Sequence, residues 1–197
     1  MAMPPSPAPD PLPRTFYDRA AADLAPALLG MTLCHRVGDR LLRARVVETE
    51  AYVGEHDLAS HASKGRTGRT DVMFGPPGHA YVYLVYGMHD MLNVVCGPAG
   101  DAQAVLVRAA EPLDGWDVNL SGPGRLARAM QITRAADNGR DLVGDVLYFA
   151  RPAEVRPVRI VRGSRVGVDY AKAWKDEPLR FCDADSAAVS KPRPTGA

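Results

Sequence analysis

The stretch Leu41–Val53 decides the fold of this chain, and it reads Leu-Leu-Arg-Ala-Arg-Val-Val-Glu-Thr-Glu-Ala-Tyr-Val. A run of this length and apolar content predicts a β-strand. A second apolar run, residues 31–37, precedes it, and Gly38-Asp39 separates the two. Because such a pair is typical of a tight turn, the two runs predict an antiparallel hairpin.

Two helices are predicted from the spacing of apolar residues and from residues that end or cap helices. Apolar positions recur at helical spacing over Phe16–Leu29, where Thr15 and Asp18 resemble a capping box and Gly30 stops the pattern. Ser121 precedes Gly-Pro-Gly and is expected to cap a second, short helix.

The remaining segments complete a domain of the α+β class. Residues 54–78 are polar and glycine-rich, and they predict a long surface excursion. Further strands are predicted at residues 79–86, 91–96, 103–110, 156–161 and 178–182. We expect one domain over residues 14–183, flanked by disordered tails at 1–13 and 184–197, which lack the apolar content to order themselves.

Composition favours a soluble, cytoplasmic protein. The 197 residues are 46% hydrophobic, enough for one sizeable core, and contain neither an apolar run long enough for a membrane span nor a signal peptide. Cys34, Cys96 and Cys182 are an odd number at wide spacing, which predicts buried free thiols rather than disulfides. The net charge of +1 does not itself indicate a nucleic-acid binder, but arginine carries most of the positive charge and suits phosphate contacts.

Two carboxylates share one face of the predicted strand 41–53. Alternation with a period of two places Val46, Glu48, Glu50 and Tyr52 on that face. The opposite face then carries Val47, Thr49, Ala51 and Val53. Paired acids beside an aromatic ring indicate a candidate catalytic site, and the alternative is a solvated face that keeps an edge strand soluble.

Arg108 is a single charge within the apolar strand Ala104–Ala110, where it shares a face with Leu106. Because buried charges are seldom unpaired, Arg108 is expected to contact Glu48, Glu50 or an anionic ligand. The alternative is an ion pair with a structural role only.

Tyrosines are concentrated in residues 79–89, which read His-Ala-Tyr-Val-Tyr-Leu-Val-Tyr-Gly-Met-His. Tyr81 and Tyr83 share a face, and cross-strand packing explains at least Tyr81. Tyr86 has the opposite parity and lies at the predicted hairpin tip, where it has less to pack against. It is therefore available to a partner, for example as a wedge between bases.

Several of these segments together resemble the alkyladenine (3-methyladenine) DNA glycosylase family. The resemblance extends over residues 15–182 and rests on motifs in near-constant spacing. They are Val47-Glu-Thr-Glu-Ala-Tyr-Val-Gly54, Ala59-Ser-His61, the Met73-Phe-Gly-Pro-Pro-Gly-His-Ala-Tyr-Val-Tyr-Leu-Val-Tyr-Gly-Met88 run, Arg108-Ala-Ala-Glu-Pro-Leu113, Ser121-Gly-Pro-Gly-Arg-Leu126 and Arg165-Val-Gly-Val168.

This resemblance implies a curved, mostly antiparallel sheet with flanking helices and a protruding DNA-binding β-hairpin. It implies a monofunctional enzyme that flips a damaged purine out of duplex DNA and hydrolyses its glycosidic bond, with Glu50 as the general base and Arg108 holding the water. The walls of the base pocket would be Tyr52, His61, Tyr83, Leu106 and Met88. Asn93 would exclude guanine, and Tyr86 would fill the gap in the duplex.

Arginines outside the pocket are candidates for contacts with the DNA backbone. Arg66 and Arg69 lie in a basic, glycine-rich stretch, and Arg125 follows Ser121-Gly-Pro-Gly. The alternative for the basic stretch is a solvated mobile loop. His56, Asp57 and His61 lack a second ligand cluster, so neither a metal nor a cofactor is expected.

The expected partner is double-stranded DNA that contains damaged purines, and the protein is expected to act as a monomer, associated with the nucleoid if bacterial. The competing interpretation is a nucleic-acid-binding module of the same fold without chemistry. The presence of both Glu50 and Arg108 favours the enzyme, because a phosphate-rich ligand repels a carboxylate that has no catalytic task.

Overall fold

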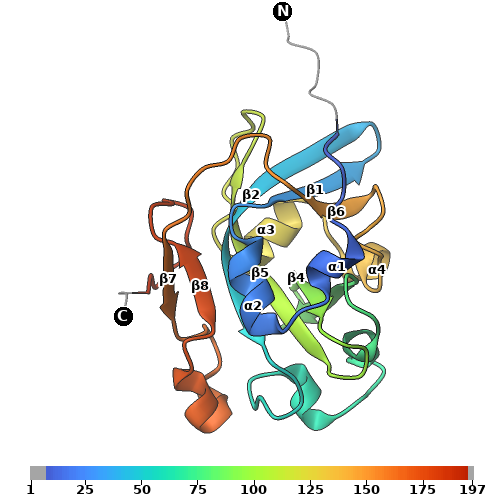
Figure 1. Cartoon of the computed structure of the whole chain (residues 1–197), viewed down its shortest axis with the longest axis vertical. Helices are drawn as coiled ribbons and strands as arrows, with labels where there is room; N and C mark the ends of the chain where they lie inside the picture. Colours follow the sequence, from blue (N-terminus) through green and yellow to red (C-terminus); the bar gives the residue numbers. More distant parts are fainter. Residues whose placement is uncertain (1–7, 195–197) are drawn as a thin grey trace, which may run out of the picture.

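The computed structural model describes residues 8–194, and its centre is an eight-stranded curved sheet (Figure 1). Six strands follow the order β3-β4-β5-β2-β1-β6, β8 pairs with both β2 and β7, and neighbouring strands are antiparallel. The strands are β1 (Thr32–Val37), β2 (Arg40–Tyr52), β3 (Ala80–Val85), β4 (His89–Cys96), β5 (Gln103–Pro112), β6 (Leu147–Ala150), β7 (Ile160–Gly163) and β8 (Arg180–Asp183). The predicted α+β class and antiparallel sheet are confirmed.

Strand β2 organises the sheet because it is long enough to pair with three other strands. One of its edges pairs with β5, while the other pairs first with β1 and then with β8. The predicted hairpin is the pair β1–β2, joined at Gly38, whose φ of +58° favours glycine. The idea that Glu48 and Glu50 face solvent on an edge strand is wrong, since β2 is internal and both side chains are buried.

Short helices cover the sheet. They are α1 (Arg14–Tyr17), α2 (Ala21–Leu28), α3 (Pro123–Ala129) and α4 (Arg134–Asp137), with 3-10 helices η1 (His61–Lys64), η2 (Asp71–Phe74) and η3 (Asp169–Asp176). Helix α2 packs on β2, and it buries Ala21, Leu24, Ala25 and Leu28 at helical spacing (Figure 1).

The single helix predicted over Phe16–Leu29 is wrong, because the chain leaves helical geometry at Asp18 and resumes it after Ala20. The break allows Tyr17 to pack against Gly78 while α2 lies on the sheet. Ser121 is not a cap either. It forms a β-bridge with Ala109, and Gly122 precedes α3 instead.

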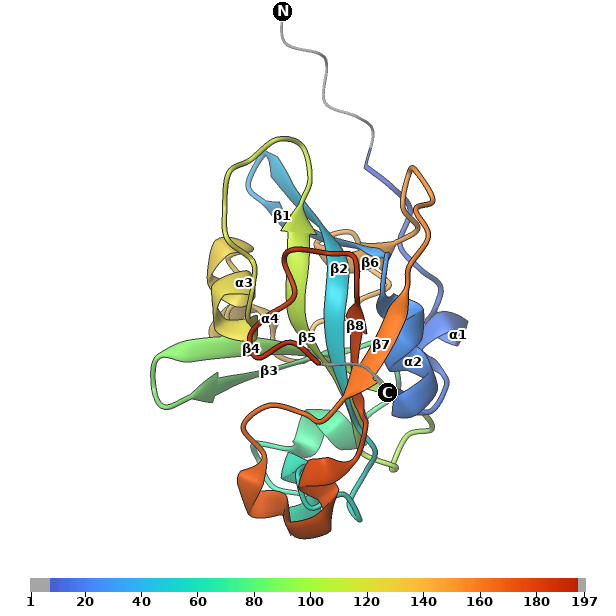
Figure 2. The same cartoon turned by 90° about the vertical axis from the view of Figure 1, so that its left-hand side faces the viewer.

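The hairpin β3–β4 projects from the body of the domain, as Figure 2 shows. Below it lie the three 3-10 helices. The predicted surface excursion, residues 54–78, contains η1 and η2, and it is not wholly exposed: Ala62 and Met73 pack with Tyr81. Segments from distant parts of the sequence therefore surround the base of the hairpin.

The packed part of the chain extends beyond the predicted domain, residues 14–183, at both ends. Leu12 is buried, and its N–H donates to the carbonyl of Phe149 at 2.7 Å. Beyond β8, Ser186, Val189 and Ser190 are buried. The predicted tails are thus partly packed, and residues 1–7 and 195–197 lie outside the part that the structure describes.

The cysteines are free and buried, as predicted. Burial raises the pKa of Cys34 to about 11 and that of Cys182 to about 12, and it also raises the pKa of Cys96. Among residues 8–194, no helix has both the length and the apolar character needed to cross a membrane.

Candidate active site

A cavity of about 550 Å³ opens at the base of the β3–β4 hairpin. Five of the six predicted base-pocket residues line it: Tyr52, His61, Tyr83, Asn93 and Leu106. Met88 does not belong to this lining. It lies in the hairpin turn with 72% of its surface exposed, so its placement in the base pocket is corrected.

One wall of the cavity is a cluster of three rings. His61 and Tyr83 meet edge to face with centroids 4.5 Å apart, and Tyr81 lies 5.4 Å from Tyr83. The Nδ1 atom of His61 is 3.0 Å from the hydroxyl of Tyr81. Burial, with smaller effects of Arg69 and Lys64, lowers the pKa of His61 to about 4, so the imidazole is neutral at pH 7.

Glu50 lies directly behind the cavity wall and is 0% exposed. Three residues that line the cavity hold its carboxylate. The hydroxyl of Tyr52 donates to Oε2 at 2.9 Å, the backbone N–H of Val166 donates to Oε1 at 2.8 Å, and Nε of Arg108 is 3.4 Å from Oε1. Burial and the proximity of Glu50 raise the pKa of Tyr52 well above its ordinary value, which keeps this phenol a donor.

A β-bulge in β2 sets the direction of the acids. The register against β5 shifts between Val46 and Glu48 and again between Glu48 and Thr49. Val46 therefore packs in the main core while Val47 joins a separate cluster with Ala109 and Cys182, so the predicted placement of Val46 on the face of Glu48 is wrong. The predicted faces hold from Glu48 onward, and the extra residue Val47 lies on the same side as Glu48.

Arg108 bridges the two acids. Its Nε is 3.1 Å from Oε1 of Glu48 and 3.4 Å from Oε1 of Glu50. Burial disfavours the guanidinium charge, but the two carboxylates outweigh it and raise the pKa of Arg108. The prediction that Arg108 finds a partner in Glu48 or Glu50 is confirmed, with both acids in contact.

The hairpin tip presents Tyr86 to solvent with 90% of its surface exposed. Tyr86 and Gly87 have φ values of +50° and +68°, and the N–H of Met88 donates to the carbonyl of Val85 at 3.0 Å. These are the features of a type I′ turn, in which a tyrosine at the first central position is unfavourable. Tyr86 is thus held away from the body of the domain at a conformational cost.

The three arginines predicted to contact the DNA backbone have different surroundings. Arg66 forms an exposed ion pair with Asp71 at 2.6 Å. Arg69 lines the cavity, and its guanidinium carbon lies 5.5 Å from the ring centroid of Tyr83. Arg125 is exposed and donates to the carbonyl of Ser121 at 3.2 Å. Arg69 therefore belongs to the lining of the cavity.

Asp57 has a structural partner. Both of its carboxylate oxygens accept from Arg165, at 2.5 and 2.9 Å, and the pair is buried. The guanidinium carbon of Arg165 also lies 4.8 Å from the ring centroid of Tyr52. Arg165 thus supports the ring whose hydroxyl reaches Glu50.

Val166, Tyr170 and Ser190 are among the residues of the site that were not predicted. Val166 acts through its backbone N–H, which leaves no trace in its side-chain type. Tyr170 is 67% exposed, lines the cavity and donates to the carbonyl of Ala59 at 3.0 Å. Ser190 donates to Glu48 from the segment that was predicted to be a tail. For Tyr170, a lone aromatic two residues after the Arg165–Val168 motif was the available signal.

Comparison with known proteins agrees with the motifs. The model of the methylpurine-DNA glycosylase family matches residues 15–187. Relatives named "Putative 3-methyladenine DNA glycosylase" occur in Anaeromyxobacter dehalogenans strain 2CP-1 (52% identical, covering 94% of this chain and 88% of the relative) and Myxococcus xanthus (50%, 94% and 96%). A third, from Legionella pneumophila strain Corby, is 47% identical and covers 91% of this chain and 98% of the relative. The chain therefore belongs to the methylpurine-DNA glycosylase family.

Proposed function

We propose that this protein is a monofunctional DNA glycosylase that takes a damaged purine out of duplex DNA and hydrolyses its N-glycosidic bond with a water activated by Glu50. The observation that carries the proposal is the fully buried Glu50 carboxylate, held by Tyr52, Arg108 and the N–H of Val166 behind an aromatic cavity. The substrates proposed are alkylated or deaminated purines of the 3-methyladenine, hypoxanthine and ethenoadenine type.

The cavity offers a flipped purine aromatic surfaces in place of its neighbours in the duplex. Extrusion costs a few kcal/mol and costs least for a damaged or mispaired base. Stacking on an aromatic side chain returns about 1–3 kcal/mol per base, which Tyr52 and Tyr83 are suited to supply. His61 is neutral at pH 7, so it adds no repulsion against a cationic, N-alkylated purine.

The hydrolytic step then needs one water between Glu50 and the sugar. Among the described residues only Tyr52 donates to Oε2 of Glu50, which leaves this oxygen a lone pair for the proton of a water. The water oxygen bonds to the anomeric carbon, the bond from that carbon to the base nitrogen breaks, and its electron pair leaves with the base. An N-alkylated purine departs as a neutral molecule.

Arg108 is suited to hold this water. It lines the cavity, and within residues 8–194 its Nη1 donates no hydrogen bond. Its guanidinium, whose Nε is 3.4 Å from Oε1 of Glu50, would also help to orient the carboxylate that acts as the general base. The carboxylate itself would stabilise the positive charge that develops on the sugar.

Selection and duplex binding are assigned to residues around the cavity. Asn93 is buried against Tyr81 and Met91, and its rigid amide would clash with the exocyclic amino group of guanine. Tyr86 would fill the gap in the duplex. The exposed Arg66 and Arg125 would contact phosphates, with Arg66 exchanging Asp71 for the DNA backbone.

We further propose that the protein acts as a monomer, because the residues that line the cavity and those that hold Glu50 come from one chain.

The test measures release of free base from duplexes that carry hypoxanthine, ethenoadenine or 3-methyladenine. Wild-type protein is expected to generate abasic sites, and Glu50→Gln is expected to abolish release while duplex affinity stays largely intact. Glu154→Gln removes an exposed carboxylate outside the cavity and serves as the matched control. Binding of lesion duplex without release by the wild type would instead identify a non-catalytic binding module.

A further inference from the structure

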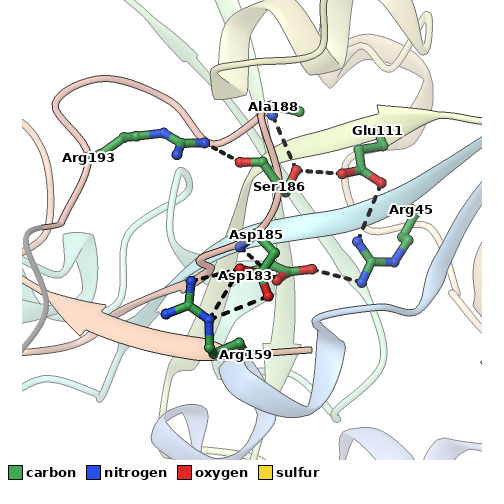
Figure 3. A network of polar contacts seen from close by, with 8 residues as sticks. All are labelled: Arg45, Glu111, Arg159, Asp183, Asp185, Ser186, Ala188 and Arg193. Carbon is green, nitrogen blue, oxygen red and sulfur yellow. Dashed lines mark hydrogen bonds and ion pairs between the residues drawn. The ribbon is translucent and has the colours of Figure 1, made fainter. Parts of the chain in front are cut away.

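The segment after β8, residues 184–194, is held to the sheet by several hydrogen bonds (Figure 3). Asp183, the last residue of β8, accepts from Arg45 at 2.8 Å, and Arg45 also approaches Glu111 at 3.4 Å. Ser186 donates to Glu111 at 2.5 Å, and the carbonyl of Ser186 accepts from Arg193. This segment therefore follows a defined path, although its composition is that of a tail.

The same path brings Ser190 to Glu48, the second acid that Arg108 contacts. The backbone N–H of Ser190 donates to Oε2 of Glu48 at 2.7 Å, and its hydroxyl donates to Oε1 at 2.9 Å. Nε of Arg180 donates to the same Oε1 at 2.7 Å, and Nη2 of Arg180 donates to the carbonyl of Ser190 at 3.0 Å. Glu48 is 0% exposed, so these donors replace water as its solvation.

These contacts influence how closely Arg108 approaches each of the two acids. Its Nε is 0.3 Å closer to Glu48 than to Glu50, since the two distances are 3.1 and 3.4 Å. A buried carboxylate with too few donors would attract the guanidinium more strongly. By donating two hydrogen bonds to Glu48, Ser190 weakens this attraction and allows Arg108 to remain beside Glu50. The hydroxyl of Ser190 also lies 3.5 Å from Nη2 of Arg108.

We propose that Ser190 is a positioning residue for base excision, which acts through Glu48 to keep Arg108 beside Glu50. The inference rests on the proposed glycosylase activity and extends it to a segment beyond residue 187, where the match to the family model ends. Ser190 does not line the cavity, and we propose no contact between Ser190 and DNA. Its effect is therefore expected in the rate of the bound complex and not in affinity.

The experiment compares Ser190→Ala with wild type in single-turnover excision of hypoxanthine from duplex DNA, alongside the Kd of the same duplex and the Tm of the protein. We expect an excision rate about tenfold lower, as loss of one hydrogen bond to a charged group predicts, with Kd unchanged within about twofold. Ser190→Thr keeps the hydroxyl and is expected to restore the rate. Ser186→Ala, in the same segment but bonded to Glu111, is expected to retain it.

Two further measurements separate positioning from a general structural role. Ser190→Cys keeps the volume with a weak donor, so it is expected to lose rate like the alanine variant even if the latter fails to fold. In a Glu48→Gln background, Ser190→Ala is expected to cause little further loss, since its route to Arg108 is already broken.

Wild-type rate in Ser190→Cys, or losses that simply add in the double variant, would overturn the positioning role and leave the proposed function standing. Absence of base release by the wild-type protein would overturn both.

Discussion

The hydroxyl of Tyr52 donates a 2.9 Å hydrogen bond to Oε2 of Glu50, two residues earlier on the same face of β2. One tyrosine thereby joins the base pocket to the general base. We expect Tyr52→Phe to keep the stacking surface but to slow single-turnover excision about tenfold, because a carboxylate held by one donor fewer is less well oriented. Duplex affinity measured by fluorescence anisotropy should stay within about twofold of wild type, and an unchanged rate would remove this hydrogen bond from the mechanism.

The pocket histidine should make stability depend on pH. Burial lowers the pKa of His61 from 6.5 to about 4. Between these values the unfolded chain takes up a proton that the folded protein does not, so this contribution to stability is complete above about pH 6.5 and decreases as the pH falls toward 4. The decrease in Tm from pH 7 to pH 5 should be larger for wild type than for His61→Asn. Equal decreases would show that His61 titrates normally.

The Tyr86 side chain is expected to lower the stability of the fold while it strengthens binding to lesion-containing duplex. Asparagine tolerates positive φ at this turn position, so Tyr86→Asn is expected to stabilise the fold by about 0.5–1 kcal/mol while weakening binding to lesion-containing duplex. Thermal unfolding and a binding titration on the same samples measure both effects.

Tyr86→Ala provides the control, since it should weaken binding in the same way without the gain in stability. Full affinity in either variant would contradict the wedge.

Arg69 should influence which lesions are preferred. Its guanidinium lies 5.5 Å from the ring centroid of Tyr83 inside the cavity, where a positive charge opposes a cationic base. Arg69→Gln is therefore expected to raise the ratio of excision rates for cationic 3-methyladenine over neutral hypoxanthine by about fivefold, a difference of about 1 kcal/mol. The ratio should not change in Arg66→Gln, whose exposed ion pair lies outside the cavity, and an unchanged ratio in both variants would exclude the charge effect.

The sequence predicted the parts of the site that depend on one strand and its side chains. Alternation and an isolated buried charge, both visible in a linear pattern, pointed to the carboxylates and to Arg108, whereas the resemblance to the family supplied the rings of Tyr52 and Tyr83 as pocket walls. Met88 was misplaced because residue order does not reveal how far the hairpin turn carries a side chain from the cavity.

Other features depend on contacts between distant segments. The break between α1 and α2 follows from the packing of Tyr17 on Gly78, which lies far away in the sequence. Ser190 was assigned to a tail because proline and polar residues around it indicate disorder when read locally. Its order comes from donors and acceptors on β2 and β8.

The bulge in β2 lets this strand carry one extra residue without exchanging its two faces. Val47 and Glu48 are consecutive but lie on the same side of the sheet, so removing Val47 would restore regular pairing of Val46 and Glu48 with β5 and leave every other residue on its present side. Homologous strands with and without this residue can therefore present the same acids to Arg108, and they can be aligned reliably only when the extra residue is matched first.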